Sequence, residues 1–536
     1  MKGHVILYDT TMRDGTQGEY ITFSAEDKLR IAKKLDEFGI PYVEGGWPGS
    51  NPKDVRFFEM AKGFDFQNVR ITAFSSTRRP GMTPQQDDNI QALLKTGMKT
   101  ITLFGKSWDV HATDILEISL EENLKMIHDT VAYLRTEGKE VVYDAEHFFD
   151  GFRANPSYAM ETLAAAQEGG AGTIVLCDTN GGRVPREITE MMDKVTGRIK
   201  VPIGIHAHND CGLALANSLA AVEAGARMVQ GTINGYGERC GNVDLIAVIG
   251  NLQFKMGYSC VPEEKIKQLT ELSRFVSEVA NVPPMNQRPF VGKSAFAHKG
   301  GVHVSAIQKN PAAYEHMDPQ LVGNRRRVLV SDLSGKSNIA YKAREMGIKL
   351  GGNGYDSQRI VAEIKHLEDQ GYQFDAAEGS LELLIKKVTG QFHEPFVLES
   401  FRVTTEKNRL GPSPCQATIK ISVGDEEEIT AAEGDGPVNA LDNALRKALT
   451  KFFPQIEEMG LVDFKVRVID GSWGTGSKVR VQIDSRDSRE IWSTIGVSEN
   501  IIEASWQALA DSVQYKLSKE QGQGLLDHEY RMQAAS

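Results

Sequence analysis

The sequence lacks the features that mark membrane, secreted and nucleic-acid-binding proteins. None of its apolar runs approaches the roughly 20 residues needed to cross a bilayer, and the N-terminus has no charged leader before an apolar core. Its five cysteines are scattered without a CxxC pair, as in proteins of a reducing compartment. The densest basic cluster, "GNRRRV", is too short for a nucleic-acid surface, and the net charge is −11. We therefore expect a cytoplasmic protein that binds neither membranes nor nucleic acid.

The first half of the chain alternates apolar, β-rich runs with amphipathic helical runs. The first β-rich run, "HVILYDTT", precedes "SAEDKLRIAKKLDEFG", in which Ser24 is a typical helix N-cap. Eight such units end near residue 256, which favours a (β/α)8 TIM barrel. A doubly wound open sheet is the alternative, but the first turn, "DTTMRDGTQ", lacks the Gly-rich fingerprint of that fold.

The pattern changes after the barrel. The Pro-rich stretch "NVPPMNQRPFVG" is typical of a linker, and short helical runs with loops follow it. From about residue 396, two similar halves lie about sixty residues apart, each with strands, a Gly-containing turn and a helix. We predict an α/β chain with a TIM-barrel catalytic domain, small helical linker subdomains and a duplicated α+β C-terminal regulatory domain, at residues 1–275, 276–390 and 391–525.

Two histidines occupy alternate positions in "IHAHND", which the pattern makes the seventh strand. Residues two apart on a strand point to the same side, so His206 and His208 face one point at the barrel mouth. Taken alone, this spacing is equally typical of two polar histidines that pack in the core and have no functional role. A functional site is favoured because other strands also end in polar residues, which converge in a barrel. These are Arg13, Asp14, Glu146, Asp178, Thr179, Glu238, Arg239 and Asn242.

Two imidazoles with a carboxylate and an amide oxygen form a mixed nitrogen and oxygen ligand set. Such a set suits Mn²⁺, Mg²⁺ or Zn²⁺, and the lack of a thiolate cluster argues against a closed structural zinc site. We therefore expect a divalent metal ion whose open positions hold the oxygens of a substrate. Cys240 lies in the same stretch as Asn242, and we interpret it as a small packed residue.

Several motifs give the chain a resemblance to a known enzyme family. "RDGTQ", "HAHND" and "GYGERCGN" match barrel motifs of the family that includes citramalate, 2-isopropylmalate and homocitrate synthases, and "VSENIIEASWQAL" matches its regulatory domain. The resemblance covers nearly the whole chain. It implies the metal ligands Asp14, His206, His208 and Asn242 and the substrate contacts Arg13, Glu146 and Thr179.

The same resemblance implies catalytic groups beyond the barrel. The family's histidine from this segment maps onto His298 in "FAHKGGVH", and its tyrosine maps onto Tyr314. Without the resemblance, each would be interpreted as a surface residue. His303, five residues after His298, is expected to be structural. The base that takes a proton from the acetyl methyl group is Glu146 or His298, the latter with Tyr314, and the sequence leaves that choice open.

Members of this family differ in the 2-oxo acid that they accept. The stretch "EGGWPGSNPKD" resembles the citramalate synthases more than the 2-isopropylmalate synthases. Phe104, at the end of the fourth strand, is the expected wall that admits the methyl group of pyruvate, and Trp47 is structural or lines the entrance. The implied reaction converts acetyl-CoA, pyruvate and water into citramalate and CoA, toward isoleucine.

Three other functions stay open at this point. A 2-isopropylmalate synthase would use 2-oxoisovalerate, in leucine biosynthesis. A barrel lyase would cleave an acyl-CoA on the same metal, but the lyases that the barrel resembles lack the C-terminal domain. A non-catalytic amino-acid sensor would keep that domain and lose the metal ligands, which are all present here.

The resemblance also implies an assembly and a mode of control. It implies a homodimer in which the linker segment of one subunit reaches the active site of the other. Isoleucine is the expected feedback effector, bound by the duplicated domain, and a domain used only for dimerisation is the alternative. Gly434, Gly436 and Gly496 are candidates for close approach of the backbone to the ligand or for tight turns.

Overall fold

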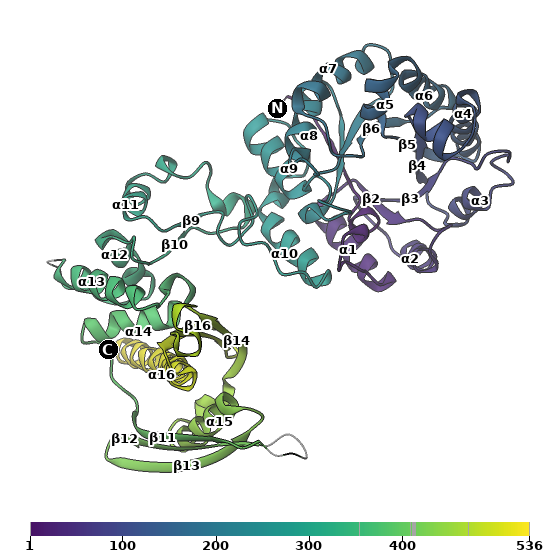
Figure 1. Ribbon diagram of the computed structural model, residues 1–536. Helices are drawn as coiled ribbons and strands as arrows, with labels where there is room; N and C mark the ends of the chain where they lie inside the picture. The colour runs from purple at the N-terminus through teal and green to yellow at the C-terminus, as the bar shows by residue number, and fades with distance from the viewer. Residues whose placement is uncertain (1, 353, 408, 410–413, 470, 535–536) are drawn as a thin grey trace. The chain divides into compact units, whose positions relative to one another are not determined.

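The chain forms two compact units in the computed structural model (Figure 1), which describes residues 2–352, 354–407, 409, 414–469 and 471–534. The first unit comprises Met1–Phe296 with Met317–Arg325, and the second comprises Ala297–His316 with Arg326–Ser536. Across these described ranges, no helix has the length and apolar character needed to span a membrane. The division into three domains at residues 275 and 390 stays a prediction.

Eight parallel strands of the first unit close into a barrel, in which β8 pairs with β1. The strands are β1 (Ile6–Asp9), β2 (Tyr42–Gly46), β3 (Arg70–Ser76), β4 (Thr100–Lys106), β5 (Glu140–Glu146), β6 (Thr173–Asp178), β7 (Ile203–Ala207) and β8 (Met228–Gly231). The predicted TIM barrel is therefore confirmed.

Helices surround the barrel, as Figure 1 shows. They are α1 (Ala25–Phe38), α2 (Pro52–Lys62), α3 (Asp88–Lys95), α4 (Leu120–Thr136), α5 (Phe148–Ala154), α6 (Pro156–Gly169), α7 (Pro185–Thr196), α8 (Ala214–Glu223), α9 (Leu245–Asn251) and α10 (Leu269–Val279). Helix α1 begins where the sequence predicts: Ser24 Oγ accepts a hydrogen bond from the Asp27 N–H at 3.0 Å, and the Asp27 carboxylate accepts from the Ser24 N–H. It ends at Gly39, whose φ of 93° favours glycine.

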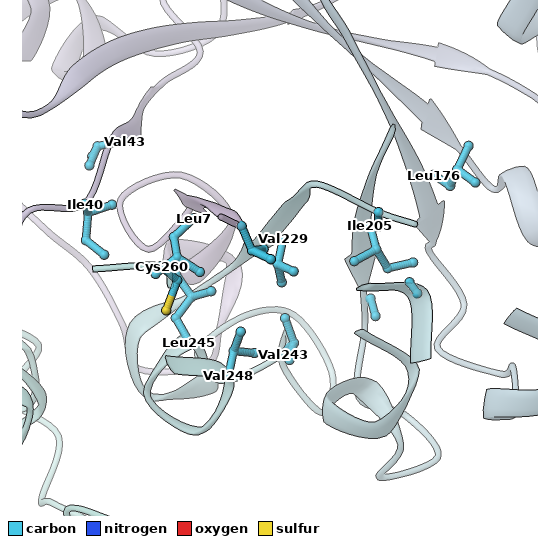
Figure 2. Packing of buried hydrophobic residues seen from close by; sticks show 14 of the residues in the cluster. Leu7, Ile40, Val43, Leu176, Ile205, Val229, Val243, Leu245, Val248 and Cys260 are labelled. Carbon is cyan, nitrogen blue, oxygen red and sulfur yellow. The ribbon is translucent and has the colours of Figure 1, made fainter. Parts of the chain in front are cut away.

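Side chains alternate along each strand between two cores. One set packs against the helices, and Figure 2 shows Leu7 and Val229 of the strands beside Leu245 and Val248 of α9. The other set fills the barrel with Tyr8, Tyr42, Val142, Val175 and Met228. Because this alternation has a period of two, it carries the inward positions up to the C-terminal ends of the strands.

The barrel interior turns polar beyond this apolar layer. The Tyr8 hydroxyl lies 2.6 Å from the hydroxyls of both Thr72 and Thr102. All three side chains are fully buried, so these hydrogen bonds offset the cost of removing the hydroxyls from water.

The second unit begins with small elements and ends in a repeated module. The small elements are β9 (Ala297–His298), β10 (Arg327–Val328), α11 (Gly301–Lys309), α12 (Lys336–Glu345), α13 (Tyr355–Asp369) and α14 (Glu378–Val388). The first module has β11 (Val397–Thr405), β12 (Cys415–Val423), β13 (Glu426–Gly434) and α15 (Pro437–Thr450). The second has β14 (Gly460–Val468), β15 (Val479–Arg486), β16 (Ile491–Ser498) and α16 (Ile501–Ala534).

Each module is a three-stranded antiparallel sheet followed by a helix, which confirms the predicted duplication. Gly434 is the last residue of β13, and Gly496 lies two residues before the end of β16. A Cβ atom at Gly434 would lie 2.4 Å from the Ala440 nitrogen, and one at Gly496 would lie 2.1 Å from the Ala504 oxygen. These glycines therefore let the last strand of each module approach its helix closely. At Gly436 a Cβ atom would meet nothing within 4 Å.

Candidate active site

The C-terminal ends of the barrel strands surround a cavity of about 290 Å³. Ten residues that the sequence singled out line it: Arg13, Asp14, Trp47, Phe104, Glu146, Thr179, His206, His208, Glu238 and Arg239. Strand periodicity therefore located the mouth of the barrel correctly. Asn242 is buried next to this lining, because its backbone forms a β-bridge with His208.

Three ligand atoms converge at the base of this cavity. His206 Nε2 lies 3.3 Å from His208 Nε2 and 3.3 Å from Asp14 Oδ2. All three side chains are buried, and one ligand atom from each lies within 4.8 Å of the others. Asn242 adds a buried amide oxygen for which the described residues provide no hydrogen-bond partner. Such a convergence of acceptors fits a cation.

The charge states of Asp14 and His208 fit metal binding, whereas Asp14 outweighs burial and raises the pKa of His206, which must lose its extra proton to bind a metal. Burial raises the pKa of Asp14, but Arg13 and the two imidazoles outweigh burial and hold this pKa well below its usual range. Asp14 is therefore a carboxylate. Burial, with the neighbouring His206, lowers the pKa of His208 to about 4, so its imidazole is neutral at pH 7, as a metal ligand must be.

Arg13 is held from three sides. Its Nε donates to Glu44 Oε1 at 2.5 Å, and its Nη1 lies 3.4 Å from Asp14 Oδ2. The guanidinium also lies 3.8 Å from the centre of the Phe74 ring, a cation–π contact. Arg13 therefore places a fixed positive charge beside the metal-ligand cluster.

An aromatic wall closes one side of the cavity. The Phe74 and Phe104 rings stack with their centres 5.2 Å apart, and Trp47 meets both edge-on, at 5.9 and 5.6 Å. The backbone N–H of Trp47 donates to Asp54 at 2.9 Å, and Asp54 in turn forms a buried ion pair with Lys28. This pair fixes the turn that presents Trp47.

Comparisons with known proteins cover both units. Residues 4–276 match the HMGL-like family, residues 290–372 match the homocitrate synthase post-HMGL domain-like family, and residues 375–517 match the LeuA allosteric (dimerisation) domain. The (R)-citramalate synthase of Aquifex aeolicus is 53% identical, over 98% of this chain and 100% of its own length. That of Geobacter sulfurreducens is 55% identical, over 96% and 98%. The chain belongs to the citramalate synthase family.

Two other comparisons give lower identity. The 2-isopropylmalate synthase of Methanocaldococcus jannaschii is 32% identical, over 96% of this chain and 95% of its own length. A crystal structure of the Bacillus subtilis HMG-CoA lyase covers 52% of this chain and 95% of its own, at 20% identity and a TM-score of 0.45. The identity to the citramalate synthases therefore exceeds that to this 2-isopropylmalate synthase by about twenty percentage points.

Three further polar groups of the barrel, on Glu146, Thr179 and Arg239, are engaged within the protein. Glu146 forms an ion pair with Lys106. The Thr179 hydroxyl accepts a hydrogen bond from the His147 N–H at 2.8 Å, which leaves its proton available for donation. Arg239 donates to both carboxylate oxygens of Asp210, at 2.7 and 2.9 Å. Cys240, expected to be packed, is exposed.

Two histidines of the second unit, His298 and His303, have different surroundings. His298 is buried, and its Nε2 lies 3.1 Å from Glu315 Oε1, while Arg326 binds both oxygens of that carboxylate. His303 is exposed and stacks on the half-exposed ring of Tyr314, with the ring centres 4.2 Å apart. Tyr314 therefore has His303 as its stacking partner, the histidine that the sequence analysis took as structural.

Sequence reasoning missed four residues around the barrel cavity. Glu44, Phe74, Asp144 and Gln230 are buried on inward-facing positions of β2, β3, β5 and β8. Glu44 and Gln230 carried a detectable signal, because each is a polar residue inside an otherwise apolar strand run. These positions lie one layer deeper in the barrel than the strand ends from which the site was predicted.

Proposed function

We propose that this chain is a citramalate synthase, an acyltransferase that condenses acetyl-CoA with pyruvate and water to give citramalate and CoA. The observation that carries the proposal is identity of 53% and 55% to two curated (R)-citramalate synthases over nearly the full length of both chains. The cavity supports it, because a cluster of metal ligands, a fixed guanidinium and an aromatic wall suit a small 2-oxo acid.

Four residues would hold the divalent ion: Asp14, His206, His208 and Asn242. When bound, Mn²⁺, Mg²⁺ or Zn²⁺ would act as a Lewis acid on the keto group of pyruvate. Arg13 stabilises the negative charge that develops on the keto oxygen, since its guanidinium is already fixed by Glu44 and Phe74. The Thr179 hydroxyl donates a hydrogen bond to the carboxylate of pyruvate.

A base must remove a proton from the acetyl methyl group. Glu146 is one candidate, and its use requires that the ion pair with Lys106 opens. The second unit offers two others. His298 was assigned from the resemblance, but its surroundings favour a structural role because it is buried against Glu315. Exposed His303, stacked on Tyr314, is the better candidate, since a base must reach the proton that it takes.

Assembly and control form a second part of the proposal. Strand β14 exposes Phe464, Val466 and Val468 at alternate positions, with 36%, 42% and 55% of each accessible. A row of this kind on a strand is typical of a surface that another chain covers. We propose a homodimer, with isoleucine as the effector of the regulatory domain and the cytoplasm as its location.

A panel of 2-oxo acids tests the activity directly. Thiol release from acetyl-CoA is measured with pyruvate, 2-oxoisovalerate and 2-oxoglutarate, each with and without EDTA. We expect release with pyruvate that EDTA abolishes and that added Mn²⁺ restores. A preference for 2-oxoisovalerate would replace the proposal by 2-isopropylmalate synthase, and no release with any acid would favour an amino-acid sensor.

A further inference from the structure

We propose that Gln230 is a positioning residue that fixes the tautomer of His206 and so prepares its Nε2 atom to bind the metal ion. The proposal rests on the metal site of the proposed function. It adds a role for two buried residues, Gln230 and Asp144, that are not among the residues proposed to hold the metal ion.

The geometry is a chain of hydrogen bonds across three strands. Gln230, on β8, is fully buried, and its Oε1 lies 2.9 Å from His206 Nδ1 on β7. The Gln230 Nε2 donates to Asp144 Oδ1, on β5, also at 2.9 Å. On the opposite side of the same imidazole, Nε2 lies 3.3 Å from both Asp14 Oδ2 and His208 Nε2.

The chemistry of the amide fixes the direction of this chain. The Gln230 amide nitrogen faces Asp144 and the amide oxygen faces His206, which is the arrangement that an ionised Asp144 requires, because a carboxylate only accepts hydrogen bonds. That oxygen also only accepts, so His206 Nδ1 must carry the ring proton. A neutral imidazole has one such proton, and its Nε2 therefore presents a lone pair to the metal-ligand cluster. In the opposite tautomer, a proton would occupy the point where the metal binds.

Packing alone does not explain a glutamine at this position. Burying an amide in the barrel is costly unless its hydrogen bonds are made, and β8 contributes an apolar residue, Met228, at the next inward position. The hydrogen bonds between Tyr8, Thr72 and Thr102 provide a comparison within the same interior. They are equally buried, and neither of these two hydrogen bonds involves His206.

The test compares three variants of the full chain. Gln230→Met keeps the length of the side chain and removes the acceptor. Gln230→Glu restores an acceptor for His206 Nδ1. Thr102→Val removes a buried hydrogen bond of the barrel that is not part of the chain to His206, and serves as the matched control. Thermal melting of each metal-free variant establishes that it is folded.

Two measurements are made on each variant. Nitrogen NMR of histidine-labelled, metal-free protein reports the tautomer of His206, whose signals are assigned by their loss in His206→Gln. Titration calorimetry with Mn²⁺ reports metal affinity. We expect Gln230→Met to shift the tautomer and to weaken Mn²⁺ binding by about 10- to 100-fold. Gln230→Glu should recover both properties, and Thr102→Val should match the wild type.

Other outcomes overturn the inference. An unchanged tautomer in Gln230→Met would show that Gln230 does not set it, and equal losses in Thr102→Val would reveal general loosening of the barrel. If the wild type binds no Mn²⁺, the metal site of the proposed function fails, and the tautomer of the metal-free protein still decides the role of Gln230.

Discussion

The two units each contain a pair of histidines, and the two pairs are built by different rules. In the barrel, His206 and His208 are both buried, and their Nε2 atoms meet because the strand points them to one side. In the second unit, His298 is buried against Glu315 while His303 lies exposed on Tyr314. Two side chains at alternate positions of one strand thus have the same burial and direction. Two side chains on either side of a strand end, one on the strand and one on the following helix, differ in both.

The largest effect is expected when one histidine of the barrel pair is removed. His208→Ala should lose bound metal and lower kcat by at least about 10³-fold, or ~4 kcal/mol, because the remaining ligands bind the ion weakly. Metal content by atomic emission and thiol release measure the two losses. The control is His128→Ala, since that histidine lies half-exposed on α4. Full turnover of His208→Ala after chelation would rule out the metal site.

The next effect distinguishes the roles of His298 and His303 in the second unit. His303→Asn should lower kcat by about 10²-fold with little change in the KM for pyruvate, as expected for a proton transfer made in the transition state. His298→Asn should instead lower the melting temperature, because it disturbs the buried contact with Glu315. Steady-state kinetics and thermal melting of both variants test this. The reverse pattern would return the catalytic role to His298.

A smaller effect concerns the aromatic wall, which only the barrel site possesses. Phe104→Ala should raise kcat/KM for larger 2-oxo acids relative to pyruvate by about 10-fold, because it opens space where the aromatic rings stack. Phe38→Leu, in a buried aromatic of α1, is the control and should leave the ratio unchanged. The wall loses its proposed role if both variants keep the wild-type ratio.

The smallest effect contrasts buried carboxyls of the two units. Burial raises the pKa of Asp9 to about 7, so the folded barrel retains a proton that the unfolded chain releases near pH 4. The free energy of unfolding should therefore fall as pH rises from 4 to 7, by up to about 1.4 kcal/mol per pH unit for this group. Urea unfolding of metal-free wild type and Asp9→Asn measures this, and parallel pH curves would contradict it.

Asp487 in the second unit should behave in the opposite way. Burial opposes its ionisation, but Lys516 and two backbone N–H groups lower its pKa to about 2. Its contribution to stability is present above pH 4 and is lost as the pH falls toward 2. Asp487→Asn should therefore remove stability at neutral pH, and no loss there would contradict the assignment.

The way each histidine pair is built explains how much of the site the sequence could predict. The period of two along β7 was enough to predict that His206 and His208 face one point, and Asp14, in the turn after β1, was predicted from the convergence of strand ends in a barrel. It did not identify Gln230, because polar residues within strand interiors were not considered. The position of His303 depends on how α11 follows β9 and on where the later loop places Tyr314. That geometry has no periodic signature in the sequence, so the sequence analysis assigned the catalytic role to His298 from the resemblance and took His303 as structural.

The Thr430 and Thr494 hydroxyls, which donate to the carbonyls of Ala444 and Ala508, each 14 residues later, show how closely the two regulatory modules follow one plan. Two chains that associate through such modules would hold four copies of one motif but only one exact twofold axis. Interfaces within a chain and interfaces between chains would then differ in their side chains. An effector that binds both kinds of interface would show two distinct affinities, whereas identical sites would show one.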